Sequence, residues 1–588
     1  MRAQTGAGRG RTSRRSAARD TEDLLPVRTR MDPRLLLITV LLLGLCAQAG
    51  AASAPRKCHI SAGNLSVGYI GASPIGAHPV PGTYETPPPV DTLTRMKQAG
   101  LDAYEDYIAW GAVEREPGKW DWTQHDREYE AVKNAGLEYV AYNWIHFPPV
   151  WLRDGGDCTL MRCVEHRQNT NTLSIFDPRT LQYYDRFYKA LHDHFGNRLD
   201  GVYACILGPY GEGNYPLDVS WLINCGHIHE GYWCADPYAL AAFRDAMRAN
   251  YVNIAALNGA WGTSLRSFSE ILPPREIAGG VKPTPAAFAS AQDRRRWLDF
   301  IIWYHQGIID FAEGSIRTAL KYWPREKVRL KPGGNAGGVN PVAWGTYCPG
   351  YAKVAAKYGI VLQPADCRGA VFGDKWVGTA YRFYGVPLST EPAGDIDTNT
   401  FVRRLFSDAS CGASQLFTYE FDRHVPELRK YAHLITGQPG ETPVAVLCPT
   451  TLYRLGGDLG PTIRACEQLR DFTDFDVLDE LLVRDGALTS HYRALVIFQN
   501  DYVDNAVQAK IDTWKQAGGS VIVGSDLLQV ESTLKPFATD GVIDGLWITR
   551  RGRDALVYNG TDKAVKCDCR ARGVAAEVAP HSIIDLPI

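Results

Sequence analysis

The feature that most constrains the fold is a regular alternation of short apolar runs with longer amphipathic ones between about residues 60 and 437. The apolar runs have the length of buried strands, and the segments between them carry apolar residues at helical spacing. Strands that alternate with helices form parallel sheets. Eight such units can be counted, so we predict an α/β chain with a (β/α)₈ barrel over residues 55–438. The expected strands are Leu65–Gly71, Leu101–Trp110, Leu137–Asn143, Gly201–Leu207, Val328–Pro332, Gly359–Gln363, Val386–Thr390 and Ser414–Tyr419, and the expected helices are 91–99, 123–135, 179–195, 237–256, 293–321, 350–357, 400–409 and 424–436.

A second pattern of the same kind begins after the turn Gly437–Gly440, which indicates a domain boundary. Apolar runs at 443–448, 494–498 and 520–524 accompany a helix expected at 503–517. They predict a flavodoxin- or amidotransferase-like α/β domain over 441–538, and alternating apolar and polar residues then predict a small β-sandwich domain over 541–588. The strand-to-helix turns of the α/β domain offer Asn500 and Ser525 without a matching Cys–His pair, so we interpret it as structural and expect a homo-oligomer contact there.

The N-terminal segment predicts export. An apolar run from Leu35 to Leu45 follows a basic residue and precedes small residues, which is typical of a secretory signal peptide within a leader at 1–54. Met31 stands just ahead of it, so we interpret Met31 as the true start; a twin-arginine leader through residues 14–15 is the alternative. No other segment approaches transmembrane length, so we expect a secreted or periplasmic protein with no membrane partner after signal removal.

Charge excludes one class of partner. The 63 basic and 65 acidic residues leave a formal net charge of −2, and no basic block follows residue 34. The chain therefore lacks the electrostatic footprint of a nucleic-acid-binding protein. The 15 Trp and 29 Tyr residues suit both a protein core and a cleft in which sugars stack on flat rings.

Fourteen cysteines in an exported chain favour disulfide bonds. Cys158 and Cys163 lie within one irregular segment and Cys225 and Cys234 within another, so each pair is expected to close a small loop. A zinc site built from the same four is the alternative, but the spacing lacks a CxxC pair. We therefore expect no metal and no other cofactor.

Two carboxylates stand where a barrel places its chemistry, at the C-terminal ends of strands. Glu212 follows the fourth expected strand in an irregular Gly- and Pro-containing turn, and Glu391 follows the seventh. Cleavage of a glycosidic bond requires one carboxylic acid to protonate the leaving oxygen and one carboxylate to attack or to activate water. Glu212 and Glu391 are therefore the predicted catalytic pair.

Other polar and aromatic residues after the strands are candidates for binding a sugar. Glu420 is a reserve candidate for nucleophile or base, whereas Glu114 precedes a Pro-Gly turn and is expected to order that loop. His227 and His229 are expected to contact the sugar, because as metal ligands they lack a third residue at defined spacing. The predicted substrate-binding residues are Trp110, Asn143, Trp144, Tyr210, Tyr215 and Glu420.

Three segments resemble the β-galactosidases of glycoside hydrolase family 42 and their relatives. Trp110–Trp122 is similar to their W-G-x-V-E-x-x-P-G-x-x-D-[WF] signature, Ala256–Thr263 to their L-N-x-A-W-G-T segment, and Ser389–Gly394 to their E-x-x-x-G nucleophile turn. The order of barrel, amidotransferase-like domain and small β domain is also similar. The resemblance implies a retaining, exo-acting enzyme for β-linked glycosides with Glu391 as nucleophile and Glu212 as acid/base.

The turn at Glu212 carries a second resemblance. The family 42 enzymes place Asn before the acid, whereas this chain has Gly211, and Leu207–Pro216 is similar to the G-P-x-G-E-x-x-Y-P turn of β-amylases, which invert. An inverting hydrolase with Glu212 as acid and Glu391 or Glu420 as base therefore remains open. A barrel that binds glycans without turnover is the alternative from a different class. In each case the expected partner is an oligo- or polysaccharide or another glycoside.

Overall fold

The computed structural model describes residues 58–63, 90–146, 148–155, 157–204, 206–208, 211–216, 226–275, 283–333, 342–364, 369–392, 396–418, 423–537, 545–569 and 574–587. All of them belong to the compact unit Arg56–Ile588. The predicted leader and signal peptide lie outside the described residues. None of the described helices is both long and apolar enough to cross a membrane.

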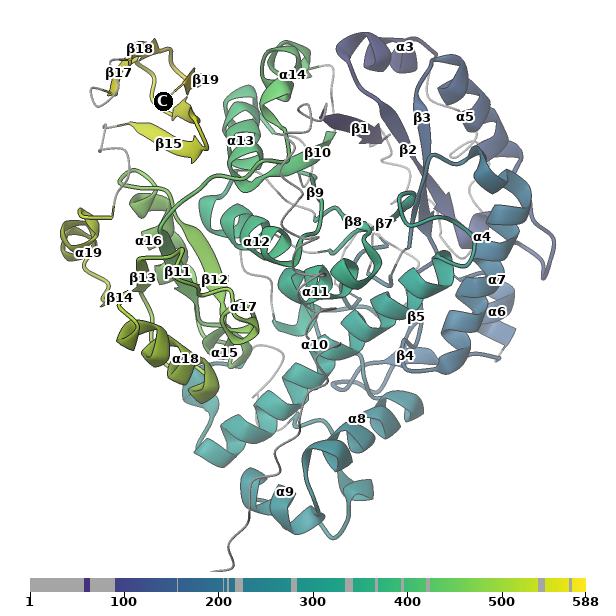
Figure 1. Ribbon diagram of the computed structural model, residues 1–588. Coiled ribbons are helices and arrows are strands. Elements are labelled where there is room, and N and C mark those ends of the chain that lie inside the picture. The colour runs from purple at the N-terminus through teal and green to yellow at the C-terminus, as the bar shows by residue number, and fades with distance from the viewer. Residues whose placement is uncertain are drawn as a thin grey trace, which may run out of the picture. The chain divides into compact units, whose positions relative to one another are not determined.

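Parallel strands close into the predicted barrel, in the order β1-β10-β9-β8-β7-β6-β3-β2 (Figure 1). Each strand pairs in parallel with its neighbours, as the alternation of strands and helices in the sequence requires. The (β/α)₈ prediction is therefore confirmed. The strands are β1 (His59–Gly63), β2 (Ala103–Ala109), β3 (Glu138–Trp144), β6 (Gly201–Tyr203), β7 (Val328–Leu330), β8 (Val361–Leu362), β9 (Leu388–Thr390) and β10 (Ala413–Thr418).

The prediction for the first strand was wrong. The strand that pairs with both β10 and β2 is β1 at His59–Gly63, not Leu65–Gly71, and 65–71 lies outside the described residues. Ile60 and Ala62 of β1 are buried in the apolar core. The intervening Ser61 is also buried and donates a hydrogen bond of 3.0 Å to Glu105 Oε1 of β2. A strand with such a polar residue in its middle does not read as an apolar run, which is why the sequence pattern missed it.

Most of the predicted helices are present. Helix α7 begins after Asp177, whose side chain accepts a hydrogen bond from the backbone N–H of Arg179. The expected helix 237–256 is divided in two, because Asn253 caps the start of a new helix. The helices of the barrel region are α3 (Val90–Ala99), α4 (Trp110–Val113), α5 (Thr123–Asn134), α6 (Val150–Gly155), α7 (Pro178–Phe195), α8 (Pro237–Asn250), α9 (Ile254–Trp261), α10 (Ala291–Ala319), α11 (Cys348–Tyr358), α12 (Val371–Tyr384), α13 (Thr398–Cys411) and α14 (Val425–Tyr431), and a short hairpin of β4 (Leu160–Arg162) and β5 (Asn169–Leu173) follows β3.

A second parallel sheet of order β12-β11-β13-β14 follows the barrel, as predicted for the α/β domain. Three antiparallel strands, in the order β15-β16-β19, and the pair β17-β18 then form the small β region around its own apolar cluster. Whether 55–438, 441–538 and 541–588 fold as separate domains stays a prediction. The strands are β11 (Val444–Cys448), β12 (Asp476–Asp479), β13 (Ala494–Ile497), β14 (Ser520–Val523), β15 (Leu546–Arg551), β16 (Asp554–Asn559), β17 (Val565–Cys569), β18 (Val574–Val578) and β19 (Ser582–Pro587), and the helices are α15 (Thr450–Arg454), α16 (Gly460–Leu469), α17 (Glu480–Asp485), α18 (Asn505–Gln516) and α19 (Leu527–Leu534).

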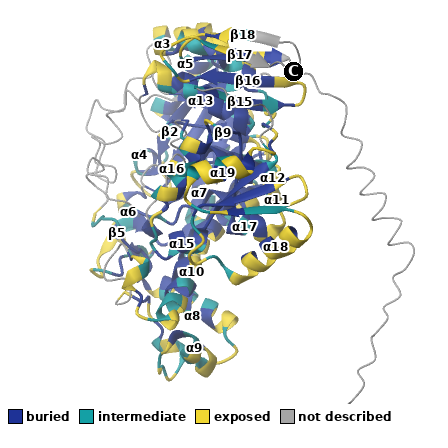
Figure 2. Cartoon of the chain, turned by 90° about the vertical axis from the view of Figure 1, so that its left-hand side faces the viewer, coloured by how far each residue is buried: buried dark blue, intermediate teal, exposed yellow. Residues whose placement is uncertain are grey.

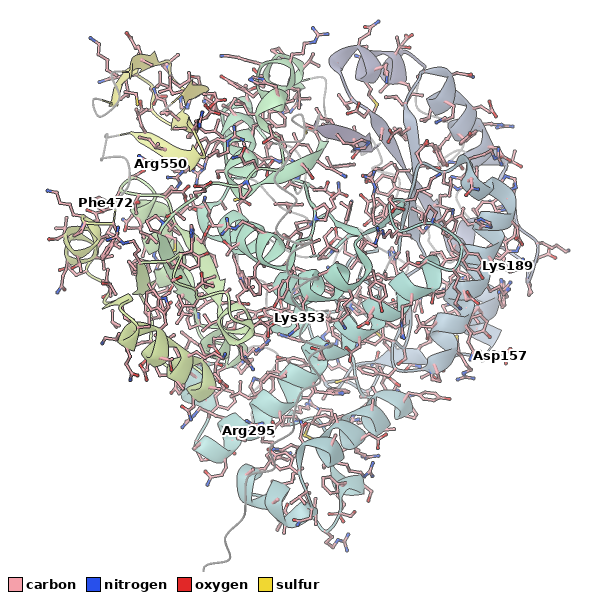
Figure 3. The ribbon with its side chains drawn as sticks, in the orientation of Figure 1. Asp157, Lys189, Arg295, Lys353, Phe472 and Arg550 are labelled. Atoms are coloured by element: carbon pink, nitrogen blue, oxygen red, sulfur yellow. The ribbon has the colours of Figure 1, made fainter. Side chains whose placement is uncertain are left out.

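Charged pairs join the barrel helices to the second sheet. Arg382 of α12 forms an ion pair with Asp476 of β12, and the Tyr492 hydroxyl donates to the same carboxylate at 2.8 Å. Lys353 of α11, labelled in Figure 3, lies 2.6 Å from Asp485 Oδ2 of α17. Buried residues are concentrated in the strands, whereas exposed ones lie on helices such as α18 and α19 (Figure 2). The sheet thus covers one side of the barrel through α11 and α12.

Candidate active site

A buried ion pair lies at the C-terminal ends of two barrel strands. Glu391 directly follows β9, and its Oε2 atom lies 2.5 Å from Nζ of Lys331, which directly follows β7. Both side chains are almost fully buried. The rings of Tyr142 and Phe417 face the Lys331 ammonium at 4.2 and 5.1 Å from their centroids. This is the end of a parallel barrel at which catalytic groups are found.

Lys331 remains charged in this position. Burial by itself lowers the pKa of Lys331, but Glu391, and then Glu105 and Glu212, offset that effect, and the net shift of its pKa is upward. A permanent ammonium at hydrogen-bonding distance stabilises the ionised carboxylate of Glu391. Glu391 is therefore held as the anion that a nucleophile or general base must be.

Glu212 also acts electrostatically on Lys331 and raises its pKa, by less than Glu391 and Glu105 do. The N–H of Gly213 donates to the carbonyl of Lys331 at 3.1 Å, which fixes the Glu212 turn against the chain that follows β7. A Cβ atom at Gly333 would lie only 2.8 Å from Glu212 Oε2, so only glycine leaves room for this carboxylate. The structure thus pairs Glu391 with a buried lysine and packs the turn of Glu212 against the segment that carries this lysine.

Gly211 seats the Glu212 turn on the end of β3. Its φ of +72° lies in the left-handed region that favours glycine. A Cβ atom there would lie 3.5 Å from the Asn143 carbonyl, from Trp144 Cδ1 and from His146 Nδ1. The predicted sugar contacts Asn143 and Trp144 therefore border the turn that carries Glu212.

Two of the other predicted substrate-binding residues, Trp110 and Tyr215, make packing contacts in the described part of the chain. Trp110 is buried, donates its indole N–H to Glu114 at 2.8 Å and packs against the rings of α7. Tyr215 stacks on Tyr304 of α10 with ring centroids 3.8 Å apart and donates to the Tyr304 carbonyl. Both contribute packing between the strands and the outer helices. Tyr210 and Glu420 lie outside the described residues.

Lys331 and the polar groups around it were missed at the sequence level. Glu105 of β2 lies 3.8 Å from Lys331 Nζ and accepts a hydrogen bond of 2.8 Å from the Tyr203 hydroxyl, which also contacts Gln363. One signal was present in the sequence, because a lysine at the end of an apolar strand has a high cost of burial unless it is paired. Glu105 offered no comparable signal, since it lies within a strand.

Arg404 of α13 fixes the strand end that carries Glu391. Its guanidinium donates to the carbonyl of Thr390 at 3.0 Å and to the carbonyl of Phe417 at 2.8 Å. It therefore bridges the ends of β9 and β10, one residue before Glu391. A buried arginine with these two acceptors holds the backbone at Glu391 in place.

The predicted Cys158–Cys163 disulfide is not formed. Both residues are free thiols, as is Cys234, whereas Cys225 lies outside the described residues. The Cys158 thiol donates to the Leu152 carbonyl at 3.4 Å, and the Cys163 sulfur accepts from the backbone N–H of His166 at 3.3 Å. The two sulfur atoms thus serve different local contacts, which their spacing in the sequence does not reveal.

Comparison with known proteins also points to glycoside hydrolases. The model of glycosyl hydrolase family 14 matches residues 79–340. The chain is similar to that family. A thermophilic β-amylase of Thermoanaerobacterium thermosulfurigenes is 28% identical over 238 residues, which are 36% of this chain and 41% of the relative. β-Galactosidase BbgII of Bifidobacterium bifidum is 26% identical over 211 residues, which are 32% of this chain and 27% of that protein.

Solved structures show the same fold. The catalytic domain of β-amylase from Paenibacillus polymyxa superposes with a TM-score of 0.51 at 20% identity, covering 65% of this chain and 100% of that domain. The β-galactosidase of Bacillus circulans sp. alkalophilus has a TM-score of 0.64 at 10% identity and covers 90% of this chain and 99% of its own. At these identities the likeness concerns the fold. In sequence, the chain spans about half or less of the length of the β-amylases it matches.

Proposed function

We propose that this protein is a glycoside hydrolase whose reacting carboxylates are Glu212 and Glu391. The observation that carries the proposal is the buried ammonium of Lys331, which is ion-paired with Glu391 and within electrostatic reach of Glu212. Two carboxylates at the C-terminal ends of barrel strands provide the acid and the anion that hydrolysis of an O-glycosyl bond needs. The substrate is an oligo- or polysaccharide or another glycoside.

The two carboxylates have different roles in this proposal. Lys331 keeps Glu391 ionised, so Glu391 attacks the anomeric carbon or removes a proton from water. Glu212, whose Oε2 lies 3.4 Å from the Asn214 amide nitrogen, protonates the leaving oxygen. In a retaining enzyme Glu212 then deprotonates the water that releases the sugar from Glu391.

The first candidate is a retaining, exo-acting enzyme for β-linked glycosides of the β-galactosidase type. Its support is the Ser389–Gly394 turn around Glu391 and the β-galactosidases among the similar proteins. The second candidate is an inverting enzyme of the β-amylase type, favoured because the family 14 match covers the Glu212 turn. The two candidates differ in substrate and in the anomer of the product.

One experiment separates them. The purified chain is incubated with an aryl β-galactoside and, separately, with amylose, and the first-formed anomer is recorded by proton NMR. Retention on the β-galactoside supports the first candidate, and release of a sugar of inverted configuration from amylose supports the second. Binding of either sugar without any product would instead favour a glycan-binding barrel that lacks turnover.

Replacement of Glu391 by Gly tests the nucleophile. We expect hydrolysis to fall by several orders of magnitude and, for a retaining enzyme, azide to restore part of the activity and to yield a glycosyl azide, because the small anion occupies the space of the lost carboxylate. Full activity of Glu391→Gly would contradict the assignment. Glu427→Gly on α14 serves as the control and should hydrolyse the substrate normally.

We also propose that the protein is exported and forms a homo-oligomer. The support for export is the apolar run before residue 46, to which the free cysteines of the described chain add nothing. The support for an oligomer is the second parallel sheet, which we interpret as a contact between chains. Mass spectrometry of the protein recovered outside the cytoplasm should show an N-terminus close to residue 55. Light scattering after size exclusion gives the number of chains, and a monomer would contradict the oligomer.

A further inference from the structure

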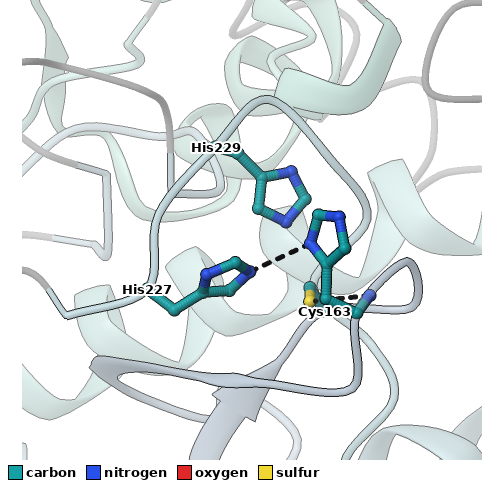
Figure 4. A group of neighbouring side chains, drawn as sticks. Cys163, His227 and His229 are labelled. Carbon is teal, nitrogen blue, oxygen red and sulfur yellow. Dashed lines mark hydrogen bonds between the residues drawn. The ribbon is translucent and has the colours of Figure 1, made fainter.

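Four side chains of types that can bind a metal ion converge in a group that includes neither Glu391 nor Lys331. Cys163 and His166 lie in the turn of the β4–β5 hairpin, and His227 and His229 lie on the segment before α8. We call these four residues the His/Cys cluster. Figure 4 shows Cys163, His227 and His229 in one group of neighbouring side chains.

Backbone hydrogen bonds join the two segments that carry the cluster. The N–H of Val164 donates to the Tyr232 carbonyl at 2.8 Å, and the N–H of Ala235 donates to the Arg162 carbonyl at 2.9 Å. Thr170 and Gly226 add an isolated antiparallel bridge. The four side chains are therefore held together by a fixed backbone rather than by chance contact between two loops.

The spacing of the donor atoms fits a small cation. One donor atom from each residue lies within 4.8 Å of the other three. Tetrahedral zinc with bonds of about 2.0–2.3 Å separates its ligand atoms by about 3.3–3.8 Å, so each donor needs to shift by less than about 1 Å. His166 Nδ1 and His227 Nε2 already lie 3.1 Å apart, and the three ring centroids are 4.7 to 5.1 Å from one another.

The hydrogen bonds of His229 leave one of its nitrogens available as a ligand. Its Nδ1 atom lies 3.0 Å from the carbonyl oxygen of Glu230, which only accepts, so Nδ1 carries the hydrogen. The Nε2 atom then has a lone pair, and it is buried without a hydrogen-bond partner among the described residues. A ligating histidine typically donates its second N–H to a carbonyl in this way. A side chain at Gly231 would collide with this ring, so the glycine keeps the position open.

We propose that the His/Cys cluster binds one divalent transition-metal ion of the zinc type through Cys163 Sγ and the nitrogens of His166, His227 and His229. One sulfur and three imidazole ligands suit zinc and exclude the hard cations Mg²⁺ and Ca²⁺, which take oxygen ligands. Binding replaces the S–H bond of Cys163 by a metal–sulfur bond, and the proton is released to solvent. Four protein ligands complete the coordination, so the ion has a structural role: it joins the segments that follow β3 and β6.

A second group of possible metal ligands in the described chain is less suited to a metal ion than the His/Cys cluster. Asp106, His125 and Glu128 also lie within 4.8 Å of one another, but all three are buried. His125 Nδ1 bonds Asp106 Oδ2 at 2.7 Å, Tyr139 donates to the same carboxylate, and Gln124 donates to Glu128 at 3.1 Å. Asp106 and His125 are thus already engaged with each other and with Tyr139 in the core between β2, β3 and α5.

Cobalt titration tests the proposal on the full chain. The protein is stripped with a chelator, desalted and titrated with Co²⁺ while visible and near-ultraviolet absorption are recorded. We expect one ion per chain, intense visible bands of tetrahedral cobalt and a sulfur-to-cobalt charge-transfer band, all removed by one equivalent of Zn²⁺. An absence of tetrahedral bands, or binding without saturation at one equivalent, would overturn the proposal.

Variants assign the ligands. Cys163→Ser should lose the charge-transfer band, and His229→Gln should weaken Co²⁺ affinity by about 100-fold or more. The matched controls are Cys158→Ser, just before β4, and His491→Gln, in the turn before β13. Both should keep the charge-transfer band and the Co²⁺ affinity. A charge-transfer band that survives in Cys163→Ser contradicts the proposal. If the variants fold poorly, alkylation of the wild type decides, because bound Zn²⁺ must slow modification of Cys163 and leave that of Cys158 unchanged.

Discussion

Lys331 is the residue on which the proposed chemistry depends most. It is buried, paired with Glu391 and close to Glu105, so its removal leaves two buried carboxylates without their cation. The same replacement removes the group that keeps Glu391 ionised. Its effect should therefore appear in the chemical step more than in substrate binding.

We predict that Lys331→Met lowers kcat by about 100-fold or more, the usual cost of removing one preorganised charge from an active site. The measurement is steady-state kinetics on the substrate identified by the anomer experiment. Lys353→Met is the control, because this lysine pairs with Asp485 outside the barrel, and its kcat should equal that of the wild type. A Lys331→Met enzyme with kcat within a few-fold of wild type would refute the role of the lysine.

Gly211 and Gly385 form a natural pair for testing the turn at Glu212. Both have a φ of +72°, but Gly385 ends α12 with no atom near its missing Cβ, whereas Gly211 borders Asn143 and Trp144. Replacement by Ala should cost each about 1–2 kcal/mol of unfolding free energy, because a left-handed backbone is unfavourable for Ala. Only Gly211→Ala should also lower kcat. Denaturant unfolding and kinetics give both quantities, and equal activity in the two variants would separate Gly211 from the site.

At the scale of elements, α12 shows what pattern analysis misses. Its helix was not predicted, although the helices on either side of it were. Ten of its residues are buried, because one side faces the barrel and the other faces the second sheet. A helix buried on both sides lacks the apolar stripe that marks a surface helix. β12 was missed for a different reason: buried Asp476 and Asp479 at its two ends leave only two apolar residues between them.

The buried carboxyl group of Asp374 in α12 should make the stability of the protein depend on pH. Burial, with a smaller contribution from Asp408, raises the pKa of Asp374 from 3.8 to about 8, although Ser407 and Arg404 oppose the shift. A carboxyl whose folded pKa is raised contributes stability below pH 3.8 that is lost as pH rises through about 8. Over that window the unfolding free energy should fall by about 1.4 kcal/mol per pH unit from this group.

Asp374→Asn should remove this pH dependence of the unfolding free energy, because the amide has no proton to lose. Its oxygen can still accept the hydrogen bond from Ser407. The stability of the variant relative to wild type should therefore increase from pH 5 to pH 8 in urea unfolding. Asp193→Asn, at an exposed ion pair on α7, is the control and should show a constant difference. A constant difference for Asp374→Asn as well would mean that Asp374 is ionised in the folded protein.

At the scale of the whole molecule, the second sheet stabilises the barrel through charged contacts with α11 and α12. In the Arg382–Asp476 pair the carboxylate is buried and the arginine is partly exposed, whereas both members of the Lys353–Asp485 pair at the same contact are partly exposed. Removing one partner of a buried pair leaves an uncompensated charge, while an exposed pair contributes little. The contact between barrel and sheet therefore depends on the first pair.

We expect Arg382→Met to lower the unfolding free energy by about 3 kcal/mol and Lys353→Met by less than about 1 kcal/mol. Denaturant unfolding followed by tryptophan fluorescence and by far-ultraviolet circular dichroism should give coincident transitions, because barrel and sheet unfold together. Two separate transitions in the wild type would show that the sheet does not stabilise the barrel.

Much of this protein was determined by local sequence pattern. Alternating strands and helices specify a barrel because each unit buries its own apolar face, and the positions of Glu212 and Glu391 after strands place them at one end of it. Tertiary structure alone decided the rest: the pairing of Lys331 with Glu391, the separate thiols of Cys158 and Cys163, and the meeting of His166 with His227 and His229. Each of these depends on the distance and direction of side chains far apart in the chain or within irregular loops, and no spacing along the sequence encodes that geometry.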